Sequence, residues 1–319
     1  MKTILNNLLE EHLNYEREQI HLITLLFGIV SPNKMFPYNL EISKCMELMK
    51  ASTLITDDFL DHSPTRNEIP SIYAKSGPEE AVLSAEILKT SATMKLCETL
   101  FSAPMRECDK NKCLLLFEDT YRTVCLGQLE EIEMTKGLVL SKIREEDYWQ
   151  MIMKTTAVFI QMPLLFGSII SQFEKPVEDA LRAYGLKIGL AYQVRDDVLD
   201  IIGDSSITGK KLGGDIKEHK VRLPIIHSFA VGNKKVKDEI KRVYDKEIVT
   251  NKDVENIINI LKKTRTLEFC SNKTKGLCLD AKKIIESIGD EIITKQLNDI
   301  SDLVGYININ NACYGKEVN

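Results

Sequence analysis

The sequence predicts an all-α fold, and three observations support this prediction. Apolar residues recur three and four positions apart along most of the 319 residues, which is the spacing of one helix face. No segment alternates apolar and polar residues over a length that would predict a strand. No glycine- or serine-rich linker divides the chain, so we expect residues 1–319 to form a single domain.

Prolines and asparagines separate the helices expected in the N-terminal half. Residues 1–30 are predicted to form one or two helices. Residues 31–39 are predicted to form a loop, because two prolines and two asparagines interrupt the pattern there. Further breaks are expected at Ser63-Pro64 and at Pro70. Helices are therefore predicted at residues 40–61, 79–100 and 112–134.

The C-terminal half is also predicted to be helical. It follows a turn at Lys136-Gly137, and Gly203 is a suitable end for the helix that precedes it. Helices are predicted at residues 145–172, 178–202, 223–230, 236–244, 253–263 and 278–305.

The composition is typical of a cytoplasmic globular protein. Hydrophobic residues make up 44% of the chain, and the net charge of −5 is mixed along it, which argues against a nucleic-acid-binding protein. No apolar run approaches the roughly 18 residues of a membrane span, and acidic residues interrupt the N-terminal segment where a secretory signal would continue. The eight cysteines form no Cys-x-x-Cys pair, so we interpret them as reduced thiols.

The most informative segment is residues 193–224, which begins as the end of an apolar helix. On that helix Asp196 and Asp200 lie one turn apart, and Asp197 lies about 100° around from Asp196. Carboxylates at this spacing repel one another, and they suit Mg²⁺, which takes one or two carboxylates together with water and phosphate oxygens. The segment then supplies cations around Gly213-Gly214, as an anion-binding loop would. These cations are Lys210, Lys211, Lys217, Lys220 and Arg222.

The same acidic pattern occurs a second time, earlier in the chain. Asp57-Asp58-Phe59-Leu60-Asp61 also follows an apolar run and is also followed by a basic residue, Arg66. One isolated Asp-Asp-x-x-Asp pattern is more often a solvated helix face, but its repetition favours a metal site. We expect the two acidic helices to face each other across a cavity in a helical bundle.

Five motifs in this order are similar to those of the all-trans isoprenyl diphosphate synthases, the polyprenyl synthetase family. The resemblance extends from about residue 40 to residue 290. It implies a single bundle of the isoprenoid synthase type around a central cavity, a Mg²⁺ cofactor and a homodimer. The motifs are the two acidic patterns, Gly127-Gln128, Lys154-Thr155, and Gly209-Lys210 with Asp215, Lys220 and Pro224.

The resemblance also implies roles for individual residues. Asp57, Asp61, Asp196 and Asp200 would be the principal metal ligands, with Asp58 and Asp197 in support. Lys154 and Lys220 would act together with these six in catalysis. The residues implied to bind the allylic diphosphate are Arg66, Lys154, Thr155, Gln193, Lys210 and Lys220.

Product length is expected to depend on the residues four and five positions before the first acidic motif. In the family these positions line the pocket for the growing prenyl tail. Here they are Thr53 and Ser52, which are small and lie about one turn from Asp57. They would permit a long tail, with a C20 product favoured over C15 and C25, although they also suit a close helix contact.

The chain departs from the family where the second substrate, isopentenyl diphosphate, would bind. Lys50 stands in place of a histidine, and Arg66-Asn67-Glu68 in place of a pair of arginines. Arg17, Lys34 and Lys50 could supply part of the missing charge. Three functions therefore remain open: a prenyltransferase that uses isopentenyl diphosphate, a terpene synthase or transferase with another acceptor, and a non-catalytic partner subunit.

Overall fold

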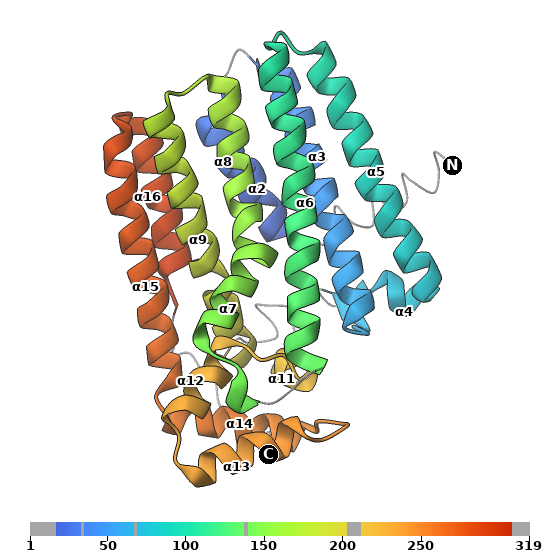
Figure 1. The fold of residues 1–319 in the computed structure, drawn as a ribbon, viewed down its shortest axis with the longest axis vertical. Helices are drawn as coiled ribbons and strands as arrows, with labels where there is room; N and C mark the ends of the chain where they lie inside the picture. Colours follow the sequence, from blue (N-terminus) through green and yellow to red (C-terminus); the bar gives the residue numbers. More distant parts are fainter. Residues whose placement is uncertain (1–16, 33–34, 67–68, 137–139, 203–211, 308–319) are drawn as a thin grey trace, which may run out of the picture. The chain divides into compact units, whose positions relative to one another are not determined.

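The structure, a computed structural model, describes residues 17–32, 35–66, 69–136, 140–202 and 212–307. Within these ranges the regular structure is helical except for one short hairpin, in which β1 (Thr65–Arg66) pairs antiparallel with β2 (Ile69–Pro70). The all-α prediction is therefore confirmed (Figure 1). The chain groups into two compact units. Its organisation as a single domain stays a prediction.

Local sequence signals account for the helices of the first unit. Gly77, with φ +94°, and Pro78 begin α5 (Pro78–Ser102), and acidic residues fill its first turn. The hydroxyl oxygen of Ser71 caps α4 (Ile72–Ser76) by accepting a hydrogen bond from the Ala74 N–H. The unit also contains α2 (Arg17–Val30), α3 (Phe36–Leu60), the start of α6 (Glu107–Lys136), nearly all of α8 (Val158–Ser171) and the start of α9 (Lys175–Ile202).

The core of the first unit fixes the end of α3. Helices α3 and α5 lie side by side (Figure 1). Ala51 and Ile55 of α3 belong to one buried cluster with Ala81, Ala85 and Leu88 of α5. Small side chains at such a contact let two helices approach closely. The aspartates that follow Ile55 are thus carried on a packed, rigid element.

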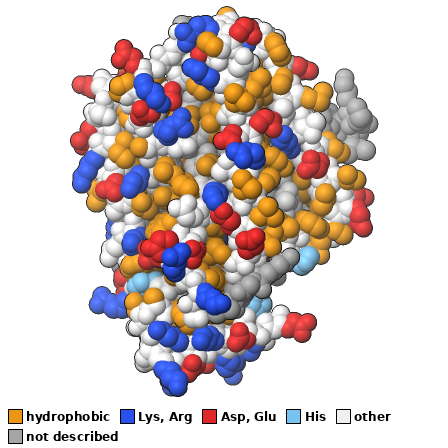
Figure 2. Space-filling view, in the orientation of Figure 1, with side chains coloured by type: hydrophobic (Ala, Val, Ile, Leu, Met, Phe, Trp, Pro, Cys, Tyr) orange, Lys and Arg blue, Asp and Glu red, His pale blue; other side chains and the backbone are white. Residues whose placement is uncertain are grey.

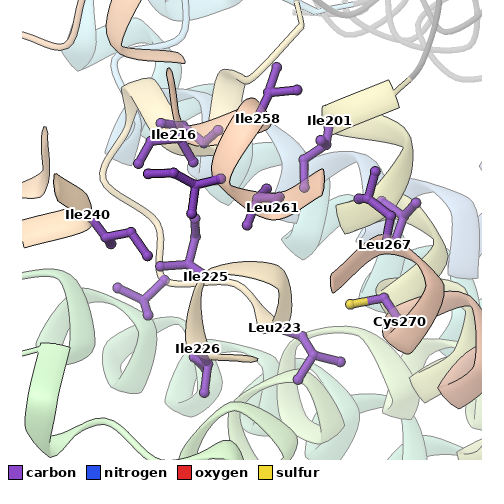
Figure 3. Packing of buried hydrophobic residues seen from close by; sticks show 14 of the residues in the cluster. Ile201, Ile216, Leu223, Ile225, Ile226, Ile240, Ile258, Leu261, Leu267 and Cys270 are labelled. Atoms are coloured by element: carbon purple, nitrogen blue, oxygen red, sulfur yellow. The ribbon is translucent and has the colours of Figure 1, made fainter. Parts of the chain in front are cut away.

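The second unit contains the rest of α6, the rest of α9, and the helices that follow each of them along the chain. Its core joins α9 to the helices between residues 214 and 285 through aliphatic side chains (Figure 3). Its further elements are α7 (Glu145–Ile152), the π-helix η3 (Met153–Ala157), α11 (Gly214–Lys217), α12 (Leu223–Val231), α13 (Lys234–Tyr244), α14 (Asn251–Lys263), most of α15 (Thr266–Ile285), the end of α16 (Glu291–Gly305) and the 3₁₀ turn η2 (Leu140–Lys142).

Several features differ from the predicted elements. The prediction of a single helix at residues 278–305 is wrong, because α15 ends at Ile285 and α16 begins at Glu291. Between them the 3₁₀ turn η4 (Glu286–Ile288) leads to Gly289, whose φ of +76° ends the helical path. The hairpin and the short helices α4 and α11 were not predicted. Residues 1–16 of the expected N-terminal helix lie outside the described residues.

The segment Glu145–Ser171 is long and apolar enough to cross a membrane by length and composition. It thus differs from the expectation that no run approaches this length. However, 61% of its most apolar window is buried inside the protein. Such burial is typical of a core helix.

Candidate active site

The first acidic motif lies at the C-terminal end of α3. Asp57 and Asp58 belong to its last turn, and Asp61 caps it. The negative end of the helix dipole disfavours carboxylates at this position. Three of them together therefore require positive charge nearby.

Arg66 supplies one positive charge from the β1–β2 hairpin. Its Nε lies 3.0 Å from both carboxylate oxygens of Asp58, and one terminal nitrogen lies 2.8 Å from Asp58 Oδ1. The same nitrogen lies 3.1 Å from Asp57 Oδ2. Asp58 is only 3% exposed, whereas Asp57 and Asp61 are half-buried. The middle aspartate is thus satisfied within the protein, and the outer two remain partly accessible.

The second acidic motif repeats this arrangement at the C-terminal end of α9. Asp197 is 1% exposed and accepts a hydrogen bond of 2.6 Å from the Tyr148 hydroxyl and one of 2.8 Å from Gln193 Nε2. Burial raises the pKa of the Asp197 carboxyl, and the nearby Arg222 guanidinium opposes this rise. Asp196 and Asp200 are half-buried. Again the middle aspartate has partners within the protein, and the outer two lie one turn apart.

Asp200 also holds the segment that follows the motif. Its carboxylate accepts hydrogen bonds from the Gly214 N–H at 3.0 Å and from the Asp215 N–H at 3.3 Å. Its backbone carbonyl accepts one from the Gly213 N–H at 2.8 Å. Gly213 has φ +71°, and a Cβ there would lie 2.3 Å from a methyl group of Val254. Only glycine suits this position, which returns the chain to the end of α9.

The outer aspartates fit a divalent cation that also takes oxygen atoms from substrate. Among the described residues, no three or more His, Cys, Asp or Glu side chains are grouped so that they could hold a metal. Each motif instead offers two half-buried carboxylates one turn apart: Asp57 with Asp61, and Asp196 with Asp200. Mg²⁺ commonly takes one or two carboxylates and completes its shell with water and phosphate. The donor set therefore suits Mg²⁺ bound together with a diphosphate.

Lys154 and Thr155 lie on the π-helix η3, a feature frequently found at functional sites. The Lys154 ammonium pairs with the Glu130 carboxylate of α6. The Thr155 hydroxyl donates to the Met151 carbonyl at 3.2 Å, and the neighbouring Thr156 hydroxyl donates to Gln193 Oε1 at 2.6 Å. Both ends of the Gln193 amide are therefore engaged, since its Nε2 donates to the second motif.

Two glycines allow neighbouring helices to contact η3 closely. A Cβ at Gly127 of α6 would lie 2.7 Å from Lys154 Cβ and 3.0 Å from the Thr155 backbone nitrogen. A Cβ at Gly189 of α9 would lie 2.4 Å from Ala157 Cα. The Gly127-Gln128 motif thus has a packing role within the second unit.

Gly127→Ala is expected to lower the free energy of unfolding by about 1–3 kcal/mol, because the added methyl group overpacks the contact with η3. Thermal and urea denaturation would measure the change. Gly276→Ala in α15 is the matched control, since a Cβ there meets nothing within 4 Å. It should raise stability through its higher helix propensity. A Gly127→Ala protein as stable as the Gly276→Ala protein would contradict the close contact.

Lys220 lies in the second unit, 7% exposed, with its ammonium 3.2 Å from Glu218. The backbone fixes it further, because its N–H donates to the Asp215 carbonyl and its own carbonyl accepts from the Tyr244 hydroxyl. Lys210, the other cation predicted in this segment, lies outside the described residues. The structure thus groups Lys154, Thr155, Gln193 and Lys220 in the unit that carries the second motif.

The remaining predicted residues lie with the first motif. Ser52 is fully buried and donates to the Met49 carbonyl at 2.7 Å, whereas Thr53 is half-buried and donates to the Lys50 carbonyl at 2.7 Å. The Lys50 ammonium lies 4.9 Å from the centre of the Phe159 ring, a cation–π contact. The expectation that the two motifs face each other, and that a tail pocket adjoins Ser52 and Thr53, stays a prediction.

Sequence reasoning predicted Gln193 as a site residue but missed the other residues around Asp197. The sequence indicates Arg222 only as one cation of a basic loop, whereas in the structure its guanidinium lies among carboxylates and is largely buried. Tyr148 and Glu131 gave no recognisable signal, because both come from other helices and reach the site only through folding.

Comparisons with known proteins identify the family of this chain. Residues 16–261 match the Polyprenyl synthetase family. A short chain isoprenyl diphosphate synthase of Methanocaldococcus jannaschii is 27% identical over 80% of this chain and 78% of its own. A geranylgeranyl diphosphate synthase of Methanosarcina mazei is 26% identical over 77% and 72%.

A solved structure supports the fold independently. Geranylgeranyl pyrophosphate synthase from Corynebacterium glutamicum, complexed with isoprenyl diphosphate and magnesium, superimposes with a TM-score of 0.85. The superposition covers 95% of this chain and 90% of that chain, at 20% identity. At this identity the likeness establishes the all-α fold alone. With the family match over most of its length, the chain belongs to the polyprenyl synthetase family.

Proposed function

We propose that this chain is a Mg²⁺-dependent prenyltransferase that joins an allylic prenyl diphosphate to isopentenyl diphosphate. The repeated acidic arrangement carries the proposal: in both motifs a buried middle aspartate is held by the protein and two outer aspartates remain accessible. Asp57, Asp61, Asp196 and Asp200 are the proposed metal ligands. Family membership and the names of the relatives support the same reaction class.

The proposed chemistry begins when the C1–O bond of the allylic substrate breaks and its electron pair leaves on the diphosphate. Arg66, Lys154 and Lys220 offer positive charge to that anion, and Thr155 offers a hydroxyl donor. When bound, Mg²⁺ supplies Lewis-acid stabilisation of the developing negative charge. The double bond of isopentenyl diphosphate then attacks the allylic cation, and loss of a proton restores an alkene.

The proposed product is a C20 diphosphate, with C15 and C25 as neighbouring lengths. Ser52 and Thr53 support this proposal because they are small and their hydroxyls already bond to their own helix. They would thus present little bulk to an apolar tail. The Methanosarcina mazei relative is named for a C20 product. A cytoplasmic location remains a prediction from composition.

One assay tests the reaction. The purified protein is incubated with Mg²⁺ and geranyl, farnesyl or geranylgeranyl diphosphate, with and without isopentenyl diphosphate, and both aqueous and hexane-soluble products are analysed. We expect a longer diphosphate only when isopentenyl diphosphate is present, and none after metal chelation. A hydrocarbon or alcohol from the allylic substrate alone would instead indicate a terpene synthase. No turnover with any substrate would indicate a non-catalytic subunit.

We further propose that the chain forms a homodimer through α5 and α6. Leu83, Ile87, Met94 and Phe101 are exposed and lie four or seven residues apart, so they form one stripe along α5. Leu115 is exposed on α6, which α5 contacts through an ion pair between Lys89 and Glu118. Hydrophobic side chains gather over these helices on the face in Figure 2. An apolar stripe of this kind is typical of a helix that packs on a partner.

Ile87→Asp combined with Met94→Asp is expected to convert the dimer into a monomer, because a buried unpaired charge would oppose association. Sedimentation equilibrium at micromolar concentration would measure the mass. Leu303→Asp on α16 is the matched control, since Leu303 is as exposed as Met94 but lies outside the stripe. A double variant that remains dimeric would exclude this surface as the interface.

A further inference from the structure

Arg222 occupies an unusual position for an arginine. It precedes α12, and its side chain is only 12% exposed. Its guanidinium contacts carboxylates from three separate elements of the second unit. One terminal nitrogen lies 2.7 Å from Glu131 of α6, and Nε lies 3.3 Å from Asp215 of α11 and 3.9 Å from Asp197 of α9.

Arg222 supplies the positive charge that these carboxylates require. Glu131, Asp197 and Asp215 bring three carboxylates around one guanidinium. Removal of a single buried partner leaves the remaining charges unpaired and costs far more than loss of a surface ion pair. A guanidinium presents several N–H groups in a fixed plane, so it can contact different carboxylates at once, as a lysine ammonium cannot do from one point.

Arg222 contacts the second acidic motif directly at Asp197 and is linked to Asp200 through Asp215. On one side it contacts Asp197, the neighbour of the proposed ligand Asp196 on α9. On the other side it donates from Nε to the Asp215 carboxylate. The backbone N–H of Asp215 donates in turn to the carboxylate of Asp200, and the Asp215 carbonyl accepts from the Lys220 N–H.

We infer that Arg222 is a positioning residue that orients Asp196, Asp200 and Lys220 for a diphosphate bound with Mg²⁺. It reaches the ligands through Asp197 and Asp215 and contacts no substrate itself. The inference rests on the proposed function, because it assigns these aspartates and Lys220 to metal and diphosphate. Residues that hold metal ligands in place without binding the metal themselves typically contribute about 10- to 100-fold to metal affinity.

The test measures binding of inorganic pyrophosphate in the presence of Mg²⁺ by titration calorimetry, with the full-length protein held well below its unfolding temperature. Arg222→Gln keeps hydrogen-bonding capacity but removes the charge. It is expected to weaken pyrophosphate binding and to raise the Mg²⁺ concentration needed for half-saturation, each by about 10- to 100-fold. Arg222→Lys restores the charge without the planar fork and should give an intermediate affinity.

Arg242→Gln is the matched control, because Arg242 lies on α13 of the same unit and pairs with Glu239 at the surface. Its affinity should equal that of the wild type. A purely structural role would lower the thermal midpoint of the Arg222 variants but leave the affinity of the folded protein unchanged, and that result would overturn the inference. Should Arg222→Gln fail to fold by circular dichroism, Arg222→Lys decides, and wild-type affinity in that variant would overturn the inference equally.

Failure of the proposed function would give a different result. If the wild-type protein bound no pyrophosphate with Mg²⁺, both the metal assignment and the inference drawn from it would be wrong. If the wild type bound pyrophosphate and the Arg222 variants bound it equally well, the assignment of the aspartates would stand and the role of Arg222 alone would be excluded.

Discussion

Asp57→Ala and Asp196→Ala should each lower kcat/KM by about a thousandfold or more, which corresponds to about 4 kcal/mol of lost transition-state stabilisation. Each change removes one of two accessible carboxylates from a proposed Mg²⁺ ligand pair. Both aspartates are half-buried beside like charges at a helix C-terminus, so their removal should cost little stability. Steady-state kinetics over a range of Mg²⁺ concentrations, with thermal denaturation of the same samples, would measure both effects.

The matched control for these variants is Asp179→Ala. Asp179 lies on α9, the helix that carries the second motif, but it is exposed and pairs with Lys175. Its replacement should leave kcat/KM close to that of the wild type. Near-normal turnover in Asp57→Ala or Asp196→Ala would overturn the metal assignment. Equal losses in Asp179→Ala would show that the effect is not specific to the motifs.

Asp197→Ala, unlike Asp57→Ala and Asp196→Ala, should cause a large loss of stability. The carboxylate receives hydrogen bonds from Tyr148 and Gln193 and lies near the Arg222 guanidinium, all within the interior. Its removal leaves these groups without their acceptor, which should lower the free energy of unfolding by about 3 kcal/mol. Urea denaturation at fixed pH would measure the difference.

Two further variants separate the sources of this loss. Tyr148→Phe removes only the hydroxyl that donates to Asp197, so it should destabilise the protein less than Asp197→Ala does. Asp196→Ala, at the adjacent position on α9, should unfold close to the wild type. If Asp196→Ala proved as destabilising as Asp197→Ala, the division into a buried middle residue and accessible outer residues would be wrong.

Most helices of this fold could be predicted from the sequence because their apolar spacing is regular. The expected segments at 79–100 and 178–202 lie within α5 and α9. The break at Gly289 was missed because apolar residues continue on both sides of it and a single glycine is compatible with a helix. The π-helix η3 was missed because a single wider turn inside an α-helix has no recognisable residue pattern of its own.

The candidate site was predictable to the extent that its chemistry is local. The spacing of Asp196 and Asp200 is visible in the sequence, because both lie on one helix turn. The distinction between these residues and Asp197 is not visible, since it arises from Tyr148 and Arg222, which folding brings together from other elements. A charge pattern alone cannot show whether a cation such as Arg222 binds a ligand or the protein itself.

The two glycine contacts of η3 have a consequence for how this chain can vary in length. Lys154 and Thr155 rest against Gly127 on α6, and Ala157 rests against Gly189 on α9. Deleting the residue between these contacts would rotate one of them around the helix axis relative to the other. No charged group would be lost, yet both contacts could not be kept. The number of residues in this turn therefore constrains the packing as strongly as their chemical identity does.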